Sequence, residues 1–455
     1  EGDYARALEN VRFASAHSEA PEKRFLILEI QLLLGLGRAE EAEELVNHAI
    51  RLKLSKRPDF LLLRSTAVRR VLEARGASAV EVEAAQIQAL NEHFTRVRMA
   101  PIAKKDPSLP LSISNLTADA QPRSRVQPLK VSVIMPAFNC ESTIEWAIES
   151  LLRQTWVNLE IIVVDDLSTD RTCERVEQIA ARDSRVRLVR KTKNEGAYPA
   201  RNTGLKHAAG DFITVHDADD WSHPQKIELQ VEALEGHPER VAVLSYWVRV
   251  KENLEILGAW LPKGGIYDVN LSSLMFRRHI LENTHPWDDV RVSADAEFHS
   301  RLVAIYGEKA VYKLPQDYLL SFSLVRDNSL TRSETTHLRS LFHGVRRNYR
   351  DAYRYWHELI TSANAGTAPA DGKRFPIPLG NRPDGAGKHR YDMVVVSDFA
   401  LFGGAFVSTL HYILAARRLG KRVAVFHWRK YDLSAYTPPN PRLYKACLEH
   451  DVDIL

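Results

Sequence analysis

Three aspartates follow an apolar run near the middle of the chain, in the sequence GDFITVHDADDW. The run from Phe212 to Val215 predicts a short buried strand, and it is followed by Asp217, Asp219 and Asp220. Carboxylates this close repel one another, and a divalent cation such as Mg²⁺ or Mn²⁺ would relieve that repulsion while also binding substrate phosphates. An isolated Asp-x-Asp can also be a polar turn after a strand. The metal interpretation therefore depends on what the rest of the chain supplies.

A second pair of acids, Asp165 and Asp166, follows another apolar run in LEIIVVDDLSTD. Helical patterns alternate with these runs and with LKVSVIMPAFN and Val186–Val189, which predicts βαβ units and a mostly parallel sheet. In such sheets ligands bind beyond the carboxyl ends of the strands. All five acids are expected at those ends.

The segment from Val131 to Leu330 resembles a family 2 glycosyltransferase with the GT-A fold, an α/β fold of Rossmann type. Four elements carry the resemblance in the family's order: VSVIMPAFN, EIIVVDDLSTDRT, KNEGAYPARNTGLKHAAGDFITVHDADDWSHP and SADAEFHSRL. The resemblance implies a nucleotide-sugar donor, a Mn²⁺ or Mg²⁺ ion, and inversion at the anomeric carbon.

The resemblance also assigns roles to individual residues of the donor site. Asp217 and Asp219 match the family's metal acids, with Asp219 the first choice as ligand, and Asp220 is expected to face the sugar hydroxyls or to support the ligands. The residues expected to bind the nucleotide are Pro136, Ala137, Asn139, Asp165 or Asp166, and Arg201.

Asp295, in SADAEF, aligns with the family's catalytic base, and Glu297 is the alternative. A positioned carboxylate is needed because the acceptor hydroxyl is a poor nucleophile until it loses its proton. Asp295 could instead be an acid that stabilises a helix N-terminus. Trp287 could stack on an acceptor sugar or belong to the core.

Several positions depart from the family pattern or have a structural alternative. Leu167 and Arg171 stand where the family often has Gly, so the loop path is expected to differ slightly. Some relatives supply a further metal ligand from a late His, for which Asp327 is the substitute here. His216 is interpreted as structural, and His223 with Pro224 as a helix start.

The flanking regions have different patterns. The first 98 residues look helical, and the similarity of GDYARALENV and GRAEEAEELV, offset by about 35 residues, suggests tetratricopeptide-like repeats or an ordinary helical hairpin domain. RYDMVVVSDF and FGGAFVSTLHYILAARRLG resemble the opening of a GT-B glycosyltransferase. The predicted segments are a helical region (1–98), a linker (99–129), a GT-A domain (130–345), a helix and linker (346–389) and a partial Rossmann-like unit (390–455).

Composition limits the remaining possibilities. The net charge of +4 on 455 residues does not favour nucleic acid, and no apolar run is long enough to span a membrane. Three widely spaced cysteines indicate a reducing compartment without a disulfide framework, so we expect a cytoplasmic protein, with contact to the inner face of the membrane left open. The chain opens at Glu1 and is expected to be a piece of a longer polypeptide.

The leading hypothesis is a metal-dependent inverting glycosyltransferase that acts on a glycan or lipid-linked glycan in bacterial surface polysaccharide synthesis, with a protein partner bound to the N-terminal helices. One alternative is a sugar nucleotidyltransferase, which would need a Gly-rich basic loop where this chain has PAFN. Another is a helical-repeat scaffold whose inactive transferase domain only binds glycan.

Overall fold

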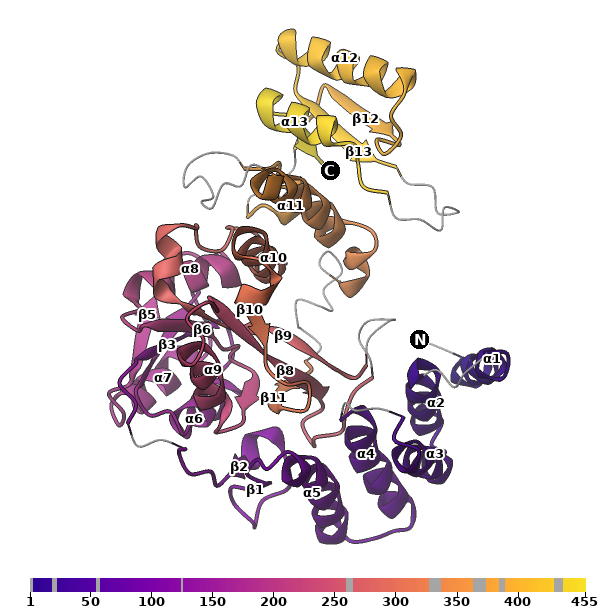
Figure 1. Cartoon of the computed structure of the whole chain (residues 1–455), viewed down its shortest axis with the longest axis vertical. Coiled ribbons are helices and arrows are strands. Elements are labelled where there is room, and N and C mark those ends of the chain that lie inside the picture. The colour runs from indigo at the N-terminus through magenta and orange to yellow at the C-terminus, as the bar shows by residue number, and fades with distance from the viewer. Residues whose placement is uncertain are drawn as a thin grey trace. The chain divides into compact units, whose positions relative to one another are not determined.

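The structure is a computed structural model that describes residues 3–18, 23–54, 58–123, 126–258, 265–326, 337–362, 374–383, 389–428 and 437–455. Figure 1 shows the helices and strands along the chain. The chain divides into two compact units. The first unit comprises Glu1–Arg190, His207–Arg277 and Tyr312–Val325, and the second comprises Lys191–Lys206, Arg278–Val311 and Arg326–Leu455.

The first unit begins with helices, as the sequence predicts. They are α1 (Tyr4–Ala16), α2 (Lys23–Gly35), α3 (Ala39–Arg51), α4 (Asp59–Ala74) and α5 (Ala79–Arg96). Helix α3 buries Ala42, Val46 and Ala49 on one face, and α5 begins with a capping box between Ser78 and Glu81. These features explain why this stretch is helical, while a tetratricopeptide-like repeat remains a prediction.

Nine strands of the described chain form one sheet in the order β5-β4-β3-β6-β9-β8-β11-β7, with β10 also paired to β8. They are β3 (Val131–Ala137), β4 (Leu159–Asp165), β5 (Val186–Arg190), β6 (Phe212–Val215), β7 (Asp220–Ser222), β8 (Ala242–Val250), β9 (Tyr267–Arg277), β10 (Val311–Lys313) and β11 (Leu319–Leu324). A separate small sheet pairs β1 (Ile102–Lys104) with β2 (Leu116–Ala118).

The large sheet is parallel from β5 to β6 and mixed beyond it, since β9 runs antiparallel to β6 and β8, and β7 antiparallel to β11. The α/β fold is confirmed and is GT-A-like, although the sheet is more mixed than a βαβ pattern alone indicates. Helices α6 (Ile144–Leu152), α7 (Thr172–Ala180) and α9 (Lys226–Glu235) pack against its strands.

Gly210, just before β6, allows two backbone segments to approach closely. A Cβ atom there would lie 2.6 Å from the backbone nitrogen of Ser132 and 2.8 Å from the carbonyl oxygen of Lys130. Gly210 also donates its N–H to Ser132 Oγ at 2.8 Å. The strand that leads to the acidic turn is therefore seated against β3 by a contact that a larger residue would disturb.

The N-terminal helices are tied to the loop that follows β8. Gln86 Nε2 donates to the Asn253 carbonyl at 3.0 Å, and the backbone N–H of Ile256 donates to Thr66 Oγ1 at 2.9 Å. Arg70 pairs with Glu255, which is 3% exposed, at 2.8 Å. Helices α4 and α5 thus share a polar, largely buried interface with the sheet domain.

The second unit contains helices and a small sheet. The helices are α8 (Ala197–His207), α10 (Ala294–Tyr306), α11 (Val345–Ser362), α12 (Gly404–Arg418) and α13 (Pro441–His450). The parallel sheet has the order β12-β13-β14, formed by β12 (Met393–Ser397), β13 (Val423–His427) and β14 (Asp453–Ile454). The predicted Gly-rich turn into a helix is present at Gly403 and Gly404, and the GT-B resemblance stays a prediction.

Two expectations about the whole chain can be compared directly. Cys140, Cys173 and Cys447 are all free thiols, in agreement with the predicted lack of a disulfide framework. Among the residues that the structure describes, none of the helices combines the length and the apolar character that crossing a bilayer requires.

Candidate active site

The carboxyl ends of β3 and β4 place the predicted nucleotide-binding residues side by side. Ala137 and Asp165 are register partners, and the Asp166 N–H donates to the Ala137 carbonyl at 2.8 Å. Pro136, which has no backbone N–H group, precedes Ala137 at the end of β3. Asp165 and Asp166 are both 3% exposed, and the Ser168 N–H lies 3.2 Å from Asp165 Oδ2.

Asn139 connects the loops that follow these two strands. Its N–H donates to Ser168 Oγ at 3.0 Å, and its Oδ1 accepts the N–H of Thr169 at 2.8 Å. Its φ of 47° lies in the left-handed region, which Asn tolerates better than most residues. Asn139 is therefore fixed by its neighbours and shapes the rim of the sheet.

The Leu167 position behaves as a glycine position would. Its φ of 69° is left-handed, so this loop adopts the conformation that Gly favours even though Leu occupies it. Arg171, at φ −84°, needs no such residue. Of the two residues that replace the family's Gly, Leu167 therefore has a strained backbone conformation and Arg171 does not.

The acidic turn connects β6 to β7. The His216 N–H donates to the Ile134 carbonyl of β3 at 3.0 Å, and the Asp220 N–H closes the turn on the Asp217 carbonyl at 3.2 Å. Asp217 and Asp219 are partly exposed, whereas Asp220 is 3% exposed. The Asp219 carbonyl accepts the N–H of Leu324 at 3.2 Å, which holds the turn against β11.

Asp220 lies in β7 opposite Ser323 of β11. Burial, followed by the negative charges of Asp217 and Asp219, raises the pKa of the Asp220 carboxyl well above its usual value. Burial also raises the pKa of the Cys140 thiol to about 12, with smaller contributions that include the charge of Asp219. The acidic turn and the loop after β3 are thus close enough to influence each other.

The donor set at this turn fits a hard divalent cation. Asp217 and Asp219 present carboxylates at a strand end, and their combined charge is already unfavourable for Asp220. Among the described residues no group of three or more His, Cys, Asp or Glu side chains is arranged to hold a metal. Mg²⁺ typically binds through one or two carboxylates plus substrate phosphates, so a pair of aspartates suits it. Asp327, the suggested extra ligand, lies outside the described residues.

The predicted base and the predicted phosphate-binding arginine both belong to the second unit. The Tyr198 hydroxyl in α8 donates to Asp295 Oδ1 at 3.0 Å. The Arg201 guanidinium lies 5.0 Å from the centre of the Tyr198 ring and is 4% exposed. Burial, followed by the negative charge of Asp295, raises the pKa of the Tyr198 hydroxyl, which therefore stays protonated as the donor. Tyr198 orients the Asp295 carboxylate, and no sequence signal indicated this role.

Glu297 has a different environment from Asp295. It is fully buried, and Arg301 contacts both of its oxygens, at 3.0 and 2.9 Å, while His357 Nε2 lies 3.0 Å from Oε1. Burial opposes ionisation, but the charges of Arg301 and His357 outweigh it and lower the pKa of Glu297 to about 2. A carboxylate held this way is suited to joining α10 to α11, so the geometry favours Asp295 over Glu297 as the base.

Trp287 is 4% exposed, and its ring lies 5.1 Å from that of Phe298. Its carbonyl accepts Asn202 Nδ2 at 2.8 Å. This burial favours the core interpretation of Trp287, since a stacking platform for a sugar would need an open ring face.

Helix α11 supports the start of α10. Ser293, which precedes α10 at a left-handed φ of 70°, accepts a hydrogen bond from Arg346 Nη1 at 3.0 Å. The Tyr349 hydroxyl donates to the buried Asp288 at 2.5 Å. Together with the His357 contact, these bonds make α11 part of the structure that carries Asp295.

His216 and His223 are both buried and hydrogen-bonded, as the structural interpretation expects. The helix after Pro224 begins slightly later than predicted, at Lys226.

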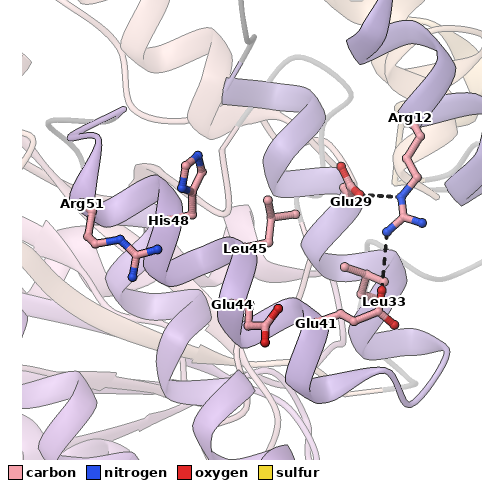
Figure 2. A pocket seen from close by; sticks show the side chains of 8 residues that line it. All are labelled: Arg12, Glu29, Leu33, Glu41, Glu44, Leu45, His48 and Arg51. Carbon is pink, nitrogen blue, oxygen red and sulfur yellow. Dashed lines mark hydrogen bonds and ion pairs between the residues drawn. The ribbon is translucent and has the colours of Figure 1, made fainter.

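A pocket of about 400 Å³ lies among α1, α2 and α3 (Figure 2). Its walls carry charges of both signs, and Arg12 pairs with Glu29 at 2.7 Å and approaches Glu41 at 3.8 Å. The lining residues are Arg12, Glu29, Leu33, Glu41, Glu44, Leu45, His48 and Arg51. None of the predicted donor or catalytic residues lines it.

Comparison with known proteins finds matches to the central part of the chain. Residues 132–287 match the model of the family described as "Glycosyl transferase family 2". The chain is 45% identical over 109 residues to "Putative glycosyltransferase EpsE" of Bacillus subtilis, which covers 24% of this chain and 39% of that protein. It is 43% identical over 104 residues to "UDP-Glc:alpha-D-GlcNAc-diphosphoundecaprenol beta-1,3-glucosyltransferase WfgD" of Escherichia coli, covering 23% and 40%. The chain thus spans about two fifths of these relatives.

Two solved structures of glycosyltransferases match parts of the chain. Staphylococcus aureus TarS 1-349 in complex with UDP matches with a TM-score of 0.34 and 20% identity, covering 44% of this chain and 61% of that one. The mannosyltransferase PcManGT of Pyrobaculum calidifontis, in complex with GDP-Man and Mn2+, matches with a TM-score of 0.35 and 20% identity, covering 68% and 77%.

Proposed function

We propose that this chain, whose residues 132–287 form a family 2 glycosyltransferase domain, is a metal-dependent inverting glycosyltransferase. It would move a sugar from a nucleotide-sugar donor, with a UDP-sugar as first choice, to a glycan acceptor in bacterial surface polysaccharide synthesis. The observation that carries the proposal is the turn that presents Asp217 and Asp219 at the carboxyl end of β6, beside the ends of β3 and β4.

The rim formed by β3 and β4 would bind the nucleoside. Asp165 and Asp166 are buried and aligned with the end of β3, so they can accept hydrogen bonds from a base or ribose without being fully hydrated. Pro136, Ala137 and Asn139 would form the wall of this pocket, and Arg201 would donate to the base or the phosphates.

Asp217 and Asp219 would hold the metal ion, and Asp220 would contact the sugar hydroxyls or support the two ligands. When bound, Mn²⁺ or Mg²⁺ would supply positive charge to the diphosphate that leaves. The partly exposed positions of Asp217 and Asp219 support this role, because a ligand can reach them.

Asp295 would take the proton of the acceptor hydroxyl. As the acceptor oxygen forms its bond to the anomeric carbon, the bond from that carbon to the diphosphate oxygen breaks, and the nucleoside diphosphate leaves from the opposite face of the sugar. The hydrogen bond from Tyr198 would keep the Asp295 carboxylate oriented while it is ionised. This support makes Asp295 a better base than the ion-paired Glu297.

The acceptor would be a glycan or lipid-linked glycan, and the protein would act in the cytoplasm or at the inner face of the membrane. The relative WfgD, whose name gives alpha-D-GlcNAc-diphosphoundecaprenol as its acceptor, supports this choice. The N-terminal helices would offer their remaining surface to a protein partner.

The direct test is to incubate the protein with Mn²⁺ and a panel of UDP-, GDP- and dTDP-sugars, and to measure donor hydrolysis and transfer. The proposal expects one donor class to turn over and Asp219→Ala to lose at least about 100-fold of that rate, since such charge stabilisation typically contributes several kcal/mol. Equal rates in both proteins would refute it. Metal-dependent UDP binding without any turnover would instead favour the inactive glycan-binding scaffold.

A further inference from the structure

Lys226 is a buried cation that follows the acidic turn in the sequence. It is the first residue of α9 and is 3% exposed, and its ammonium donates to Ser222 Oγ at 3.1 Å. Burial lowers the pKa of the Lys226 ammonium to about 8, and the negative charges of Asp220 and Asp217 oppose that effect in part. A lysine is rarely buried without a specific partner, so this placement calls for an explanation.

The hydrogen bonds that follow from Lys226 have only one consistent direction. His216 Nδ1 lies 2.9 Å from the carbonyl of Asp217, and a carbonyl can only accept, so Nδ1 carries the proton. His216 is 2% exposed and both of its ring nitrogens meet uncharged groups, the Asp217 carbonyl and Ser222 Oγ, so the ring is neutral. Its Nε2, 2.9 Å from Ser222 Oγ, must therefore accept the Ser222 proton, which leaves a Ser222 lone pair for Lys226.

This chain of donors ends on the backbone atom that defines the acidic turn. The Asp217 carbonyl accepts from His216 Nδ1 and also from the Asp220 N–H at 3.2 Å. Ser222 itself is anchored, since its N–H donates to Ser150 Oγ of α6 at 3.3 Å. Lys226, Ser222 and His216, which all belong to the first unit, thus form a series of hydrogen bonds that ends at this turn.

We propose that Lys226, acting through Ser222 and His216, positions the turn that presents Asp217 and Asp219 to the metal ion. The inference rests on the proposed function, and it assigns Lys226 a positioning role with no contact to the substrate. Groups that orient metal ligands typically change metal affinity 10- to 100-fold when they are removed. A Lys226 that acted only through its charge would have the opposite effect, because removing a cation beside two acids strengthens their attraction for a metal.

The test measures Mn²⁺ binding rather than activity, by titrating Mn²⁺ into the protein with saturating UDP and following free Mn²⁺ by electron paramagnetic resonance. Lys226→Met removes the charge and the donor, while Ser222→Ala breaks only the connection and is the smaller change. We expect each variant to weaken Mn²⁺ binding by about 10-fold or more, and the double variant to be no weaker than the worse single one. The exposed Lys313→Met is the matched control and should bind as the wild type does.

Two results would overturn the inference. Tighter Mn²⁺ binding by Lys226→Met would identify a purely electrostatic role, and unchanged binding by Ser222→Ala would identify a purely structural one. Melting temperatures of all variants show whether each is folded under the titration conditions. Asp219→Asn in the same titration separates the two proposals: if it binds Mn²⁺ like the wild type, the proposed metal site fails, whereas loss in Asp219→Asn with no effect in Ser222→Ala defeats only the role of Lys226.

Discussion

Acidification should destabilise the protein through His223, which lies between the helical region and the sheet. The His223 Nε2–H donates to the Ala100 carbonyl at 2.9 Å, and Nδ1 accepts the N–H of Gln225 at 3.3 Å. The side chain is fully buried and its ring stacks on Phe94 at 5.3 Å. A second ring proton would therefore face an N–H group, and the imidazolium would have no water around it.

The magnitude follows from the pKa of His223. Burial lowers that pKa from 6.5 to about 4, so the unfolded chain binds a proton more readily than the folded one between these values. The stabilising effect is thus complete above pH 6.5 and is lost as the pH falls toward 4. Linkage gives a loss of about 2.4 kcal/mol in the free energy of unfolding between pH 7 and pH 4.5 from His223 alone. His93, whose pKa is also lowered to about 4 by burial, adds to the wild-type slope.

The assay is urea unfolding at several pH values between 7 and 4.5. His223→Gln keeps a donor and an acceptor but cannot be protonated, so it should reduce the pH-dependent loss by about 2.4 kcal/mol relative to the wild type. His237→Gln, at a side chain that is 46% exposed, is the control and should keep the wild-type slope. The same slope in His223→Gln and the wild type would refute the reasoning.

Three further predictions concern single side chains. Asp295→Asn should lower kcat by about 10²- to 10⁴-fold with an unchanged Kd for UDP, and comparable rates in transfer assays would contradict the assignment of the base. Leu167→Gly should leave the free energy of unfolding within about 1 kcal/mol of the wild type. Leu167→Val should lower it by about 1–2 kcal/mol, because a β-branched residue suits a left-handed φ poorly. Equal urea midpoints for Leu167→Val and the wild type would argue against backbone strain. His357→Ala should lower the free energy of unfolding by about 2 kcal/mol, because it removes one partner of the buried Glu297, and an unchanged urea midpoint would show that Arg301 suffices.

The strands that lead to the donor site could be predicted from the sequence. Apolar runs bounded by acids or turn residues gave the strands β3, β4, β5 and β6 close to their observed bounds, because a buried parallel strand reads as a continuous apolar run. These strands depend on local sequence. The left-handed φ of Leu167 was not anticipated, since the replacement of the family's Gly was expected to change the path of the loop.

Features that depend on distant partners were not predictable. The sequence analysis assigned no strand between Val241 and Pro286, yet this stretch contains the long antiparallel strands β8 and β9, whose pairing defines the second half of the sheet. Glu297 and Asp295 stand two residues apart with similar chemistry, and only the contacts of Arg301 and His357 distinguish them. Lys226 carries no motif, because its role depends on Ser222 and His216 meeting it in the fold.

The most direct measurement is anomalous diffraction from crystals soaked with Mn²⁺ and UDP. We expect a manganese peak within coordination distance of the Asp219 carboxylate and of the UDP diphosphate, with the nucleoside beside Asp165 and Asp166. A nucleotide bound elsewhere in the chain, with no manganese at the acidic turn, would contradict it.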